Sequence, residues 1–401
     1  MQPWKAKNLL GFAAGILGFG LAVSPARAAF TSLYIFGDGV SATTNNTTGP
    51  GVYYYGLRYS NGRVWVELLA QQLDLINNYW YSNNSSIHLS YTNLSAFSTN
   101  WSYSSNNWSF YGDYSPVLLT NLNYFATPPN ASNALFIVWV NDADFVGYLN
   151  SFGQPNNSDH GTNLSSWTNA INQSLINHSN IINSLHAKGA RTLIMPNAVD
   201  ITEVPYYNTS PAAYKSFVRQ MVISFNTAFA ALLNHAKAML PELTIYEPDT
   251  FGLLDNALTN AAAYGLTNAL YNGQSIDTVE AYGYGLLPNA NLNGPGTNYI
   301  FWDPLDPTAK FHAVLADVVK QLIAPAQITN FTALNGNCQM GMASLPIGLN
   351  GFVDGTTNLV LGNWTTATNV VSTNAAQTVF FPASGPVWFY RLRFPYAWSW
   401  P

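Results

Sequence analysis

The sequence predicts an α/β domain, with a mostly parallel sheet covered by helices on both faces, followed by a small all-β module. Two observations indicate the α/β domain: short continuous apolar runs typical of buried strands, and the alternation of such strands with long amphipathic helices. The third observation is a change after residue 326 to short strands between Gly/Asn turns. We therefore expect domains at 29–325 and 326–401.

Residues 1–28 have the pattern of a secretory signal peptide. Lys5 and Lys7 precede an apolar run from Leu9 to about Val23, and small residues mark a cleavage site after Ala28. A membrane anchor is the alternative interpretation, but glycines interrupt the run, which is short for a membrane span. We expect export to the periplasm, the cell surface or the medium, and no transmembrane span in the mature chain.

The composition excludes several classes of partner and site. Only 8% of the 401 residues are charged and the net charge is −5, so the basic surface typical of nucleic-acid binding is absent. Cys338 is the single cysteine, which excludes an internal disulfide and a cysteine-based zinc site. It is either a buried strand residue or a thiol nucleophile. We expect no nucleic-acid partner, no cofactor and no metal.

The first predicted strand runs into a tight turn at residues 37–39. Its apolar residues 33–36 are followed by Gly37-Asp38-Gly39 and by a helix-compatible segment that begins at Ser41. Open α/β sheets place their functional groups at such turns, at the carboxyl ends of strands. Position 39 is a glycine, however, and has no side chain to contribute.

The next elements follow from hydrophobic periodicity. A run of apolar residues at 133–140 predicts a central strand, which ends in a polar segment at 141–144. The stretch 77–115, rich in Asn, Ser, Tyr and Trp, is either a sugar-binding aromatic platform or aromatic surface filler. The remaining predictions are helices at 61–75, 164–188, 210–240 and 308–322, and strands at 192–195 and 243–247.

Taken together, the motifs resemble those of the GDSL or SGNH family of ester hydrolases, in its exported lipase/acylhydrolase branch. The resemblance covers most of residues 30–325 and implies the SGNH hydrolase fold, a flavodoxin-like three-layer α/β/α sandwich. It also implies hydrolysis of ester bonds as the family activity. The segments that carry the resemblance are residues 35–38, 60–67, 138–140, 264–268 and 301–308.

The catalytic positions that the resemblance assigns are mostly substituted. The nucleophile position is Gly39, the oxyanion asparagine position is Ala143, and the base position is Asp306. Asp303, the acid that orients the base, is the only retained triad position. Loss of the nucleophile or the base from such a triad costs on the order of a million-fold in turnover. We therefore expect a pseudoenzyme that has lost ester hydrolysis.

Displaced groups would keep an active enzyme possible. Ser41 is a candidate displaced nucleophile, His312 a candidate displaced base, and Asn141 stands two residues before the oxyanion position. Structural roles are the alternative: Ser41 suits capping or packing of a first helical turn. His312 falls on the closing helix, where this branch often carries a second, non-catalytic histidine.

Several aspartates are expected near the ends of neighbouring strands. If Asp38, either Asp142 or Asp144, and Asp303 and Asp306 gather around the space vacated at position 39, they could bind a cation or the hydroxyls of a sugar. The alternative is that several point outward and that Asp38 serves only its backbone turn.

Three functions follow from these observations. The first is a non-catalytic pseudo-hydrolase that acts as a ligand-binding or structural protein, with a small-molecule ester or a carbohydrate as ligand. The second is an active carboxylic-ester hydrolase with relocated groups. The third is a cell-surface or adhesive protein acting through its C-terminal module, which resembles β modules appended to exported bacterial enzymes. The oligomeric state stays open.

Overall fold

A computed structural model of the chain describes the central parts of both predicted domains. The predicted signal peptide lies outside the described residues, as does most of the aromatic stretch 77–115. The described residues are 30–43, 54–55, 58–73, 75, 106–151, 162–266, 299–334, 336–346, 350–360, 363–383 and 388–394.

The described strands of the first domain form one parallel sheet in the order β1-β2-β3-β4. β2 is buried at every position, as its continuous apolar run predicts for a strand covered on both faces. The strands span Ser32–Gly37 (β1), Ala134–Trp139 (β2), Thr192–Ile194 (β3) and Thr244–Tyr246 (β4).

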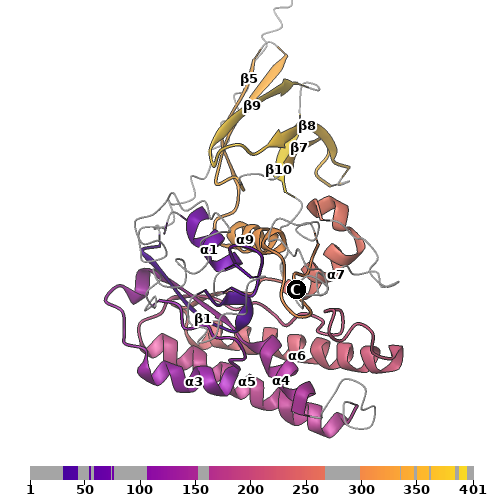
Figure 1. Ribbon diagram of the computed structural model, residues 1–401. Coiled ribbons are helices and arrows are strands. Elements are labelled where there is room, and N and C mark those ends of the chain that lie inside the picture. Colours follow the sequence, from indigo (N-terminus) through magenta and orange to yellow (C-terminus); the bar gives the residue numbers. More distant parts are fainter. Residues whose placement is uncertain are drawn as a thin grey trace, which may run out of the picture.

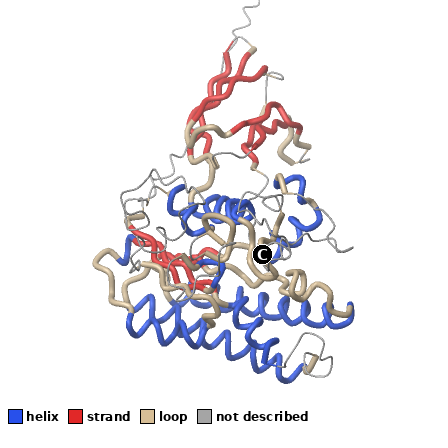
Figure 2. Tube along the Cα trace, in the orientation of Figure 1, coloured by secondary structure: helices blue, strands red, loops and turns tan. Residues whose placement is uncertain are grey.

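Helices cover both faces of this sheet, so the predicted α/β fold class is confirmed (Figures 1 and 2). On one face lie α1 (Trp65–Gln72) and α9 (Ala309–Ile323), which contact each other. The opposite face carries α3 (Ser115–Tyr124), α4 (Asn141–Ser151), α5 (Leu164–Ala187) and α6 (Ala212–Met239). The remaining described elements are α7 (Thr250–Thr259) and the short 3-10 helices Gly39–Ser41, Ala131–Asn133 and Ala261–Tyr264.

Local sequence signals explain where the long helices begin and end. The side chain of Asn163 accepts a hydrogen bond from the backbone N–H of Ser166 at the start of α5. α5 ends before Gly189, whose φ of +90° is costly for other residues. α9 begins after Thr308, whose hydroxyl accepts from the N–H of Phe311. These caps agree with the predicted helix limits.

Among the described residues, α6 alone has the length and apolar composition that a membrane span needs. Its face around Val218, Val222, Phe225 and Phe229 is buried in the main core, next to α5.

The chain after α9 forms two small antiparallel sheets, ordered β5-β6-β9 and β10-β7-β8 within the described residues (Figure 1). They enclose a separate core that includes Cys338, Met340, Val353 and Phe381. Cys338 is 1% exposed on β6, which fits the structural interpretation of this residue. The strands span Gln327–Leu334 (β5), Asn337–Ala343 (β6), Asn350–Thr356 (β7), Thr365–Val371 (β8), Gln377–Pro382 (β9) and Phe389–Arg393 (β10).

Candidate functional site

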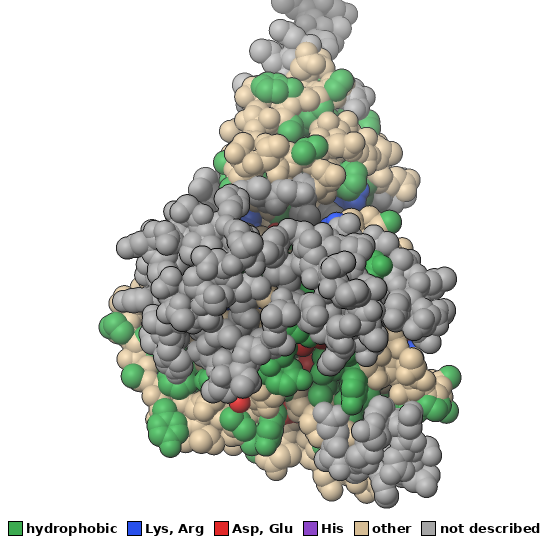
Figure 3. Space-filling view, in the orientation of Figure 1, with side chains coloured by type: hydrophobic (Ala, Val, Ile, Leu, Met, Phe, Trp, Pro, Cys, Tyr) green, Lys and Arg blue, Asp and Glu red, His purple; other side chains and the backbone are tan. Residues whose placement is uncertain are grey.

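A cavity of about 330 Å³ lies at the carboxyl ends of the parallel strands. Each strand delivers residues to its wall: Asp38 follows β1, Asp142 follows β2, Val199 follows β3 and Thr250 follows β4. Parallel strands present their carboxyl ends at one edge of a sheet, where α/β folds bind ligands. Figure 3 shows acidic side chains beside hydrophobic ones near the middle of one face of the molecule.

The turn after β1 places Gly39 opposite Asp306. The Oδ1 atom of Asp38 accepts a hydrogen bond from the N–H of Val40 at 3.1 Å, which stabilises the turn. A Cβ atom added to Gly39 would lie 3.5 Å from Oδ1 of Asp306 and 2.8 Å from Cδ2 of Tyr111. The positions of the family nucleophile and base therefore still face each other, without a hydroxyl or an imidazole. The ring of Tyr111 occupies part of the space that a side chain at position 39 would need.

Tyr111 is held over the turn by a second aromatic ring. Its ring stacks on that of Tyr59 with 4.3 Å between centroids and 20° between planes. Because the side chain is half exposed, Tyr111 forms an outer wall of the cavity and not part of the core. Nothing in the sequence singles out Tyr111 from the other aromatic residues of the stretch 77–115.

Asp303 accepts hydrogen bonds from its own turn and from a tyrosine. Its Oδ1 atom accepts from the N–H groups of Leu305 at 2.8 Å and Asp306 at 2.7 Å, and Oδ2 accepts from the hydroxyl of Tyr54 at 2.7 Å. These bonds fix the turn that carries Asp306. The retained orienting acid thus has a structural role in a chain whose base position lacks an imidazole.

Asp38, Asp142 and Asp306 line the cavity, and burial raises the pKa of each carboxyl group. Burial raises the pKa of Asp38 to about 7. Burial, and then the charges of Asp303 and Asp38, raise the pKa of Asp306 well above its ordinary value. The pKa of Asp142 is likewise raised well above the usual range, by burial and then by Asp38. Strongly perturbed carboxyl groups in a cavity are typical of functional sites.

The residues of the first turn of α4 point in different directions. Asp142 and Ala143 line the cavity. Asn141 instead donates from Nδ2 to the carbonyl of Pro196 at 2.8 Å. Asp144 accepts from the N–H of Ser115 at 2.8 Å and from the hydroxyl of Ser174 at 2.5 Å. Asn141 and Asp144 therefore hold α4 in place and do not line the cavity.

Ser41 and His312 lie on either side of Trp65, outside the cavity lining. The Oγ atom of Ser41 accepts from the indole N–H of Trp65 at 3.1 Å, and Nδ1 of His312 accepts from its backbone N–H at 3.2 Å. Both side chains have no exposed surface. Burial lowers the pKa of His312 to about 3, which makes the imidazole a weak base. This geometry supports structural roles for both residues.

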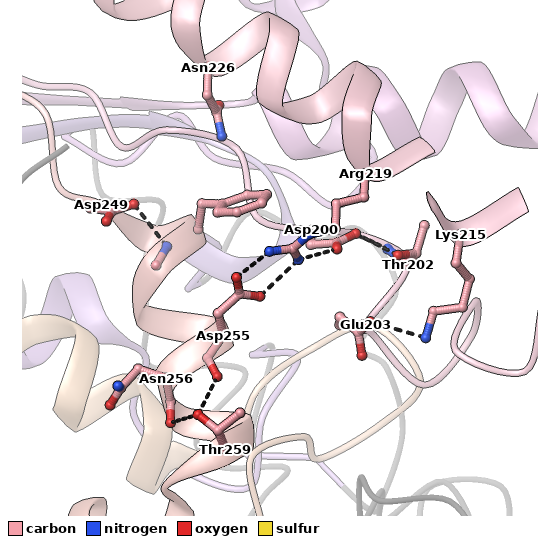
Figure 4. Close-up of polar contacts among 12 residues, drawn as sticks. Asp200, Thr202, Glu203, Lys215, Arg219, Asn226, Asp249, Asp255, Asn256 and Thr259 are labelled. Atoms are coloured by element: carbon pink, nitrogen blue, oxygen red, sulfur yellow. Dashed lines mark hydrogen bonds and ion pairs between the residues drawn. The ribbon is translucent and has the colours of Figure 1, made fainter. Parts of the chain in front are cut away.

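An ion-pair network supports the wall that follows β3. Figure 4 shows Arg219 reaching from α6 between Asp200 and Asp255. Asp200 also accepts from the backbone and the hydroxyl of Thr202 at 3.0 and 2.6 Å. The network fixes the segment that places Ile201 and Val204 in the cavity wall. This segment could not be predicted from the sequence because it forms no regular element.

Within the described ranges, no group of three or more His, Cys, Asp or Glu side chains is arranged to hold a metal ion. The remaining cavity wall is mainly apolar and includes Val146, Leu253, Leu254, Phe301 and Phe311. Such a wall suits hydrocarbon or aromatic groups better than a strongly hydrated ion.

A parallel sheet with this cavity at its strand ends, next to a Gly-Asp turn and a closing Trp-Asp turn, defines an α/β protein with a candidate ligand site at the carboxyl edge of its sheet. The chain belongs to the GDSL-like lipase/acylhydrolase family, whose family model matches residues 33–319. It is also similar to a GDSL esterase/lipase of Arabidopsis thaliana. The two are 21% identical over 329 residues, which cover 73% of this chain and 89% of the plant protein.

Proposed function

We propose that this chain is a non-hydrolytic member of the GDSL family that binds a small, largely apolar molecule in the strand-end cavity. The carrying observation is that the cavity persists although position 39 has no side chain and Tyr111 occupies part of its space. Acyl transfer to water needs a nucleophile with a base beside it. No serine, cysteine or histidine is among the described residues that line the cavity.

The wall of the cavity supports an apolar ligand over an oligosaccharide. Small-molecule sites typically have volumes of about 300–1,000 Å³ and apolar walls with a few polar groups. The cavity, at about 330 Å³, has this character, with carboxyl groups at one side and aliphatic and aromatic side chains around the rest. The proposal includes export, supported by the signal-peptide pattern at residues 1–28.

Calorimetric titration of the purified chain with n-octanol tests this function. We expect saturable binding that Gly147→Phe weakens at least about tenfold, since the ring would fill the cavity that this glycine lines. A Cβ at Gly147 meets no atom within 4 Å, so a side chain can start there without a clash at its first carbon. Val360→Phe, at a residue 94% exposed in the C-terminal module, is the matched control and should bind normally. Equal binding by Gly147→Phe and the natural chain would place the ligand elsewhere.

A further inference from the structure

We infer that the cavity takes an organic cation, an apolar amine whose ammonium group lies against the carboxyl group of Asp306, in the cavity that Asp38 and Asp142 also line. This inference rests on the proposed function, because it names the chemical class of ligand for the same cavity. Three observations support it. The described residues place no positive side chain in the cavity, Asp306 lines the cavity, and the rest of the cavity wall is mainly apolar.

Among the described residues, no lysine, arginine or histidine lines the cavity beside these carboxyl groups. Every lysine and arginine beyond residue 29 lies among the described residues, and none of them lines the cavity. Several pair with other carboxylates: Arg58 with Glu67, Lys215 with Glu203, Arg219 with Asp200 and Asp255, and Arg391 and Arg393 with Asp354. A buried carboxylate needs a paired charge or must take up a proton. A ligand with a positive charge would provide what the chain does not.

Asp306 is the best placed of these groups. Its side chain lines the cavity although the residue is only 4% exposed, and Oδ1 lies 3.5 Å from the point that a Cβ at Gly39 would occupy. Among the described residues, its side chain is hydrogen-bonded to another carboxyl group, that of Asp303. The cavity therefore meets, at Asp306, a buried carboxyl whose described side-chain partner is itself acidic.

The rest of the wall selects the kind of cation. Tyr111, Trp139 and Phe301 present aromatic groups that favour organic ammonium ions. Leu253 and Leu254 add hydrocarbon surface for an apolar tail. A fatty carboxylate would instead bring a further negative charge to three acidic groups, which is unfavourable. The preferred order is therefore amine over alcohol over carboxylate.

Binding of an amine should be coupled to loss of protons. The cavity carboxyls have raised pKa values, about 7 for Asp38 and well above the ordinary range for Asp142 and Asp306. The other groups whose charges act on these carboxyls are Asp113, Asp144 and Asp303. All three are aspartates, so none of them supplies a positive charge. A bound ammonium ion lowers these pKa values, so the complex holds fewer protons than the free chain.

Linkage then requires the affinity for the amine to rise with pH. The rise should extend from about pH 6 to about pH 9, above which a primary amine itself begins to lose its charge. Tyr111 and Tyr114 are the other titratable residues of the described wall, and neither carries a positive charge. The affinity for a neutral alcohol should not rise.

Titration calorimetry with n-octylammonium, n-octanol and n-octanoate at about pH 8 tests the inference. We expect octylammonium to bind at least about tenfold more tightly than octanol, and octanoate to bind most weakly. Asp306→Asn and Asp142→Asn should each weaken octylammonium about tenfold or more and leave octanol unchanged. Asp317→Asn is the control, because Asp317 is a buried carboxyl bonded to Gln72 outside the cavity lining.

The outcomes separate the two proposals. If octanol binds as tightly as octylammonium, the cation assignment is wrong and the proposed ligand-binding function stands. If none of the three compounds binds, both proposals fail. Thermal unfolding of each variant without ligand shows whether the substitution leaves the fold intact, and Asp142→Asn decides the matter if Asp306→Asn unfolds.

Discussion

The fourfold variant Gly39→Ser, Ala143→Asn, Asp306→His, Tyr111→Ala should hydrolyse p-nitrophenyl octanoate about a thousandfold faster than the natural chain. The physical reason is that the required positions are still in place. Gly39 and Asp306 face each other across the end of β1, and Ala143 lines the same cavity. Asp303 lies three residues before position 306 and can orient an imidazole there.

Tyr111 is included because a serine at position 39 would otherwise collide with it, its Cβ lying 2.8 Å from the ring. We expect the threefold variant that keeps Tyr111 to be slower, and the variant that omits Asp306→His to lose most of the gain. The measurement is the initial rate of nitrophenol release with equal concentrations of folded protein. A folded fourfold variant no faster than the natural chain would show that these positions do not form a catalytic arrangement.

Arg58→Met should lower the free energy of unfolding by about 3–5 kcal/mol, because it leaves a buried charge without its partner. The side chains of Arg58 and Glu67 are 1% and 2% exposed, and their closest N–O distance is 2.5 Å. Glu67 also accepts from the N–H of Val64 at 3.0 Å, at the start of α1. The pair therefore connects the segment before α1 to the helix itself.

Denaturant unfolding of full-length variants checks this effect. Adding Glu67→Gln to Arg58→Met should recover part of the loss, since the amide removes the unpaired charge and can still accept from Val64. Lys215→Met is the matched control, because its pair with Glu203 is partly exposed on both sides. Its removal should cost at most about 1 kcal/mol. Equal losses for Arg58→Met and Lys215→Met would contradict the role given to the buried pair.

The parallel sheet could be predicted because hydrophobic patterns alone specify it. β2 is buried throughout, and the short length of its apolar run, with its β-branched and aromatic residues, favours a strand over a buried helix. The helices α3 and α4 were missed, since neither sequence has a clear apolar stripe. β5 and β8 were missed because much of their surface is exposed, and Thr and Asn make up most of β8.

Part of the candidate site could also be predicted. Gly39, Ala143 and Asp306 were expected at one edge of the sheet, and the structure brings them to one cavity. Asp142 and Asp144 could not be distinguished without knowing that they lie on a helix. Two residues correspond to a rotation of about 200°, which turns Asp142 to the cavity and Asp144 to α5. The place of Tyr111 in the cavity wall could not be predicted, because the ring is held by stacking on Tyr59, which is distant in the sequence.

The most direct test of the central claim is the hydrolysis of p-nitrophenyl octanoate by the unmodified chain. We predict that the natural chain and the Ser41→Ala variant, at the same concentration in the same buffer, release nitrophenol at the same rate. The reason is that Ser41 and His312 are buried against Trp65. Saturable turnover by the natural chain that disappears in Ser41→Ala would contradict the account and identify an active esterase with a displaced nucleophile.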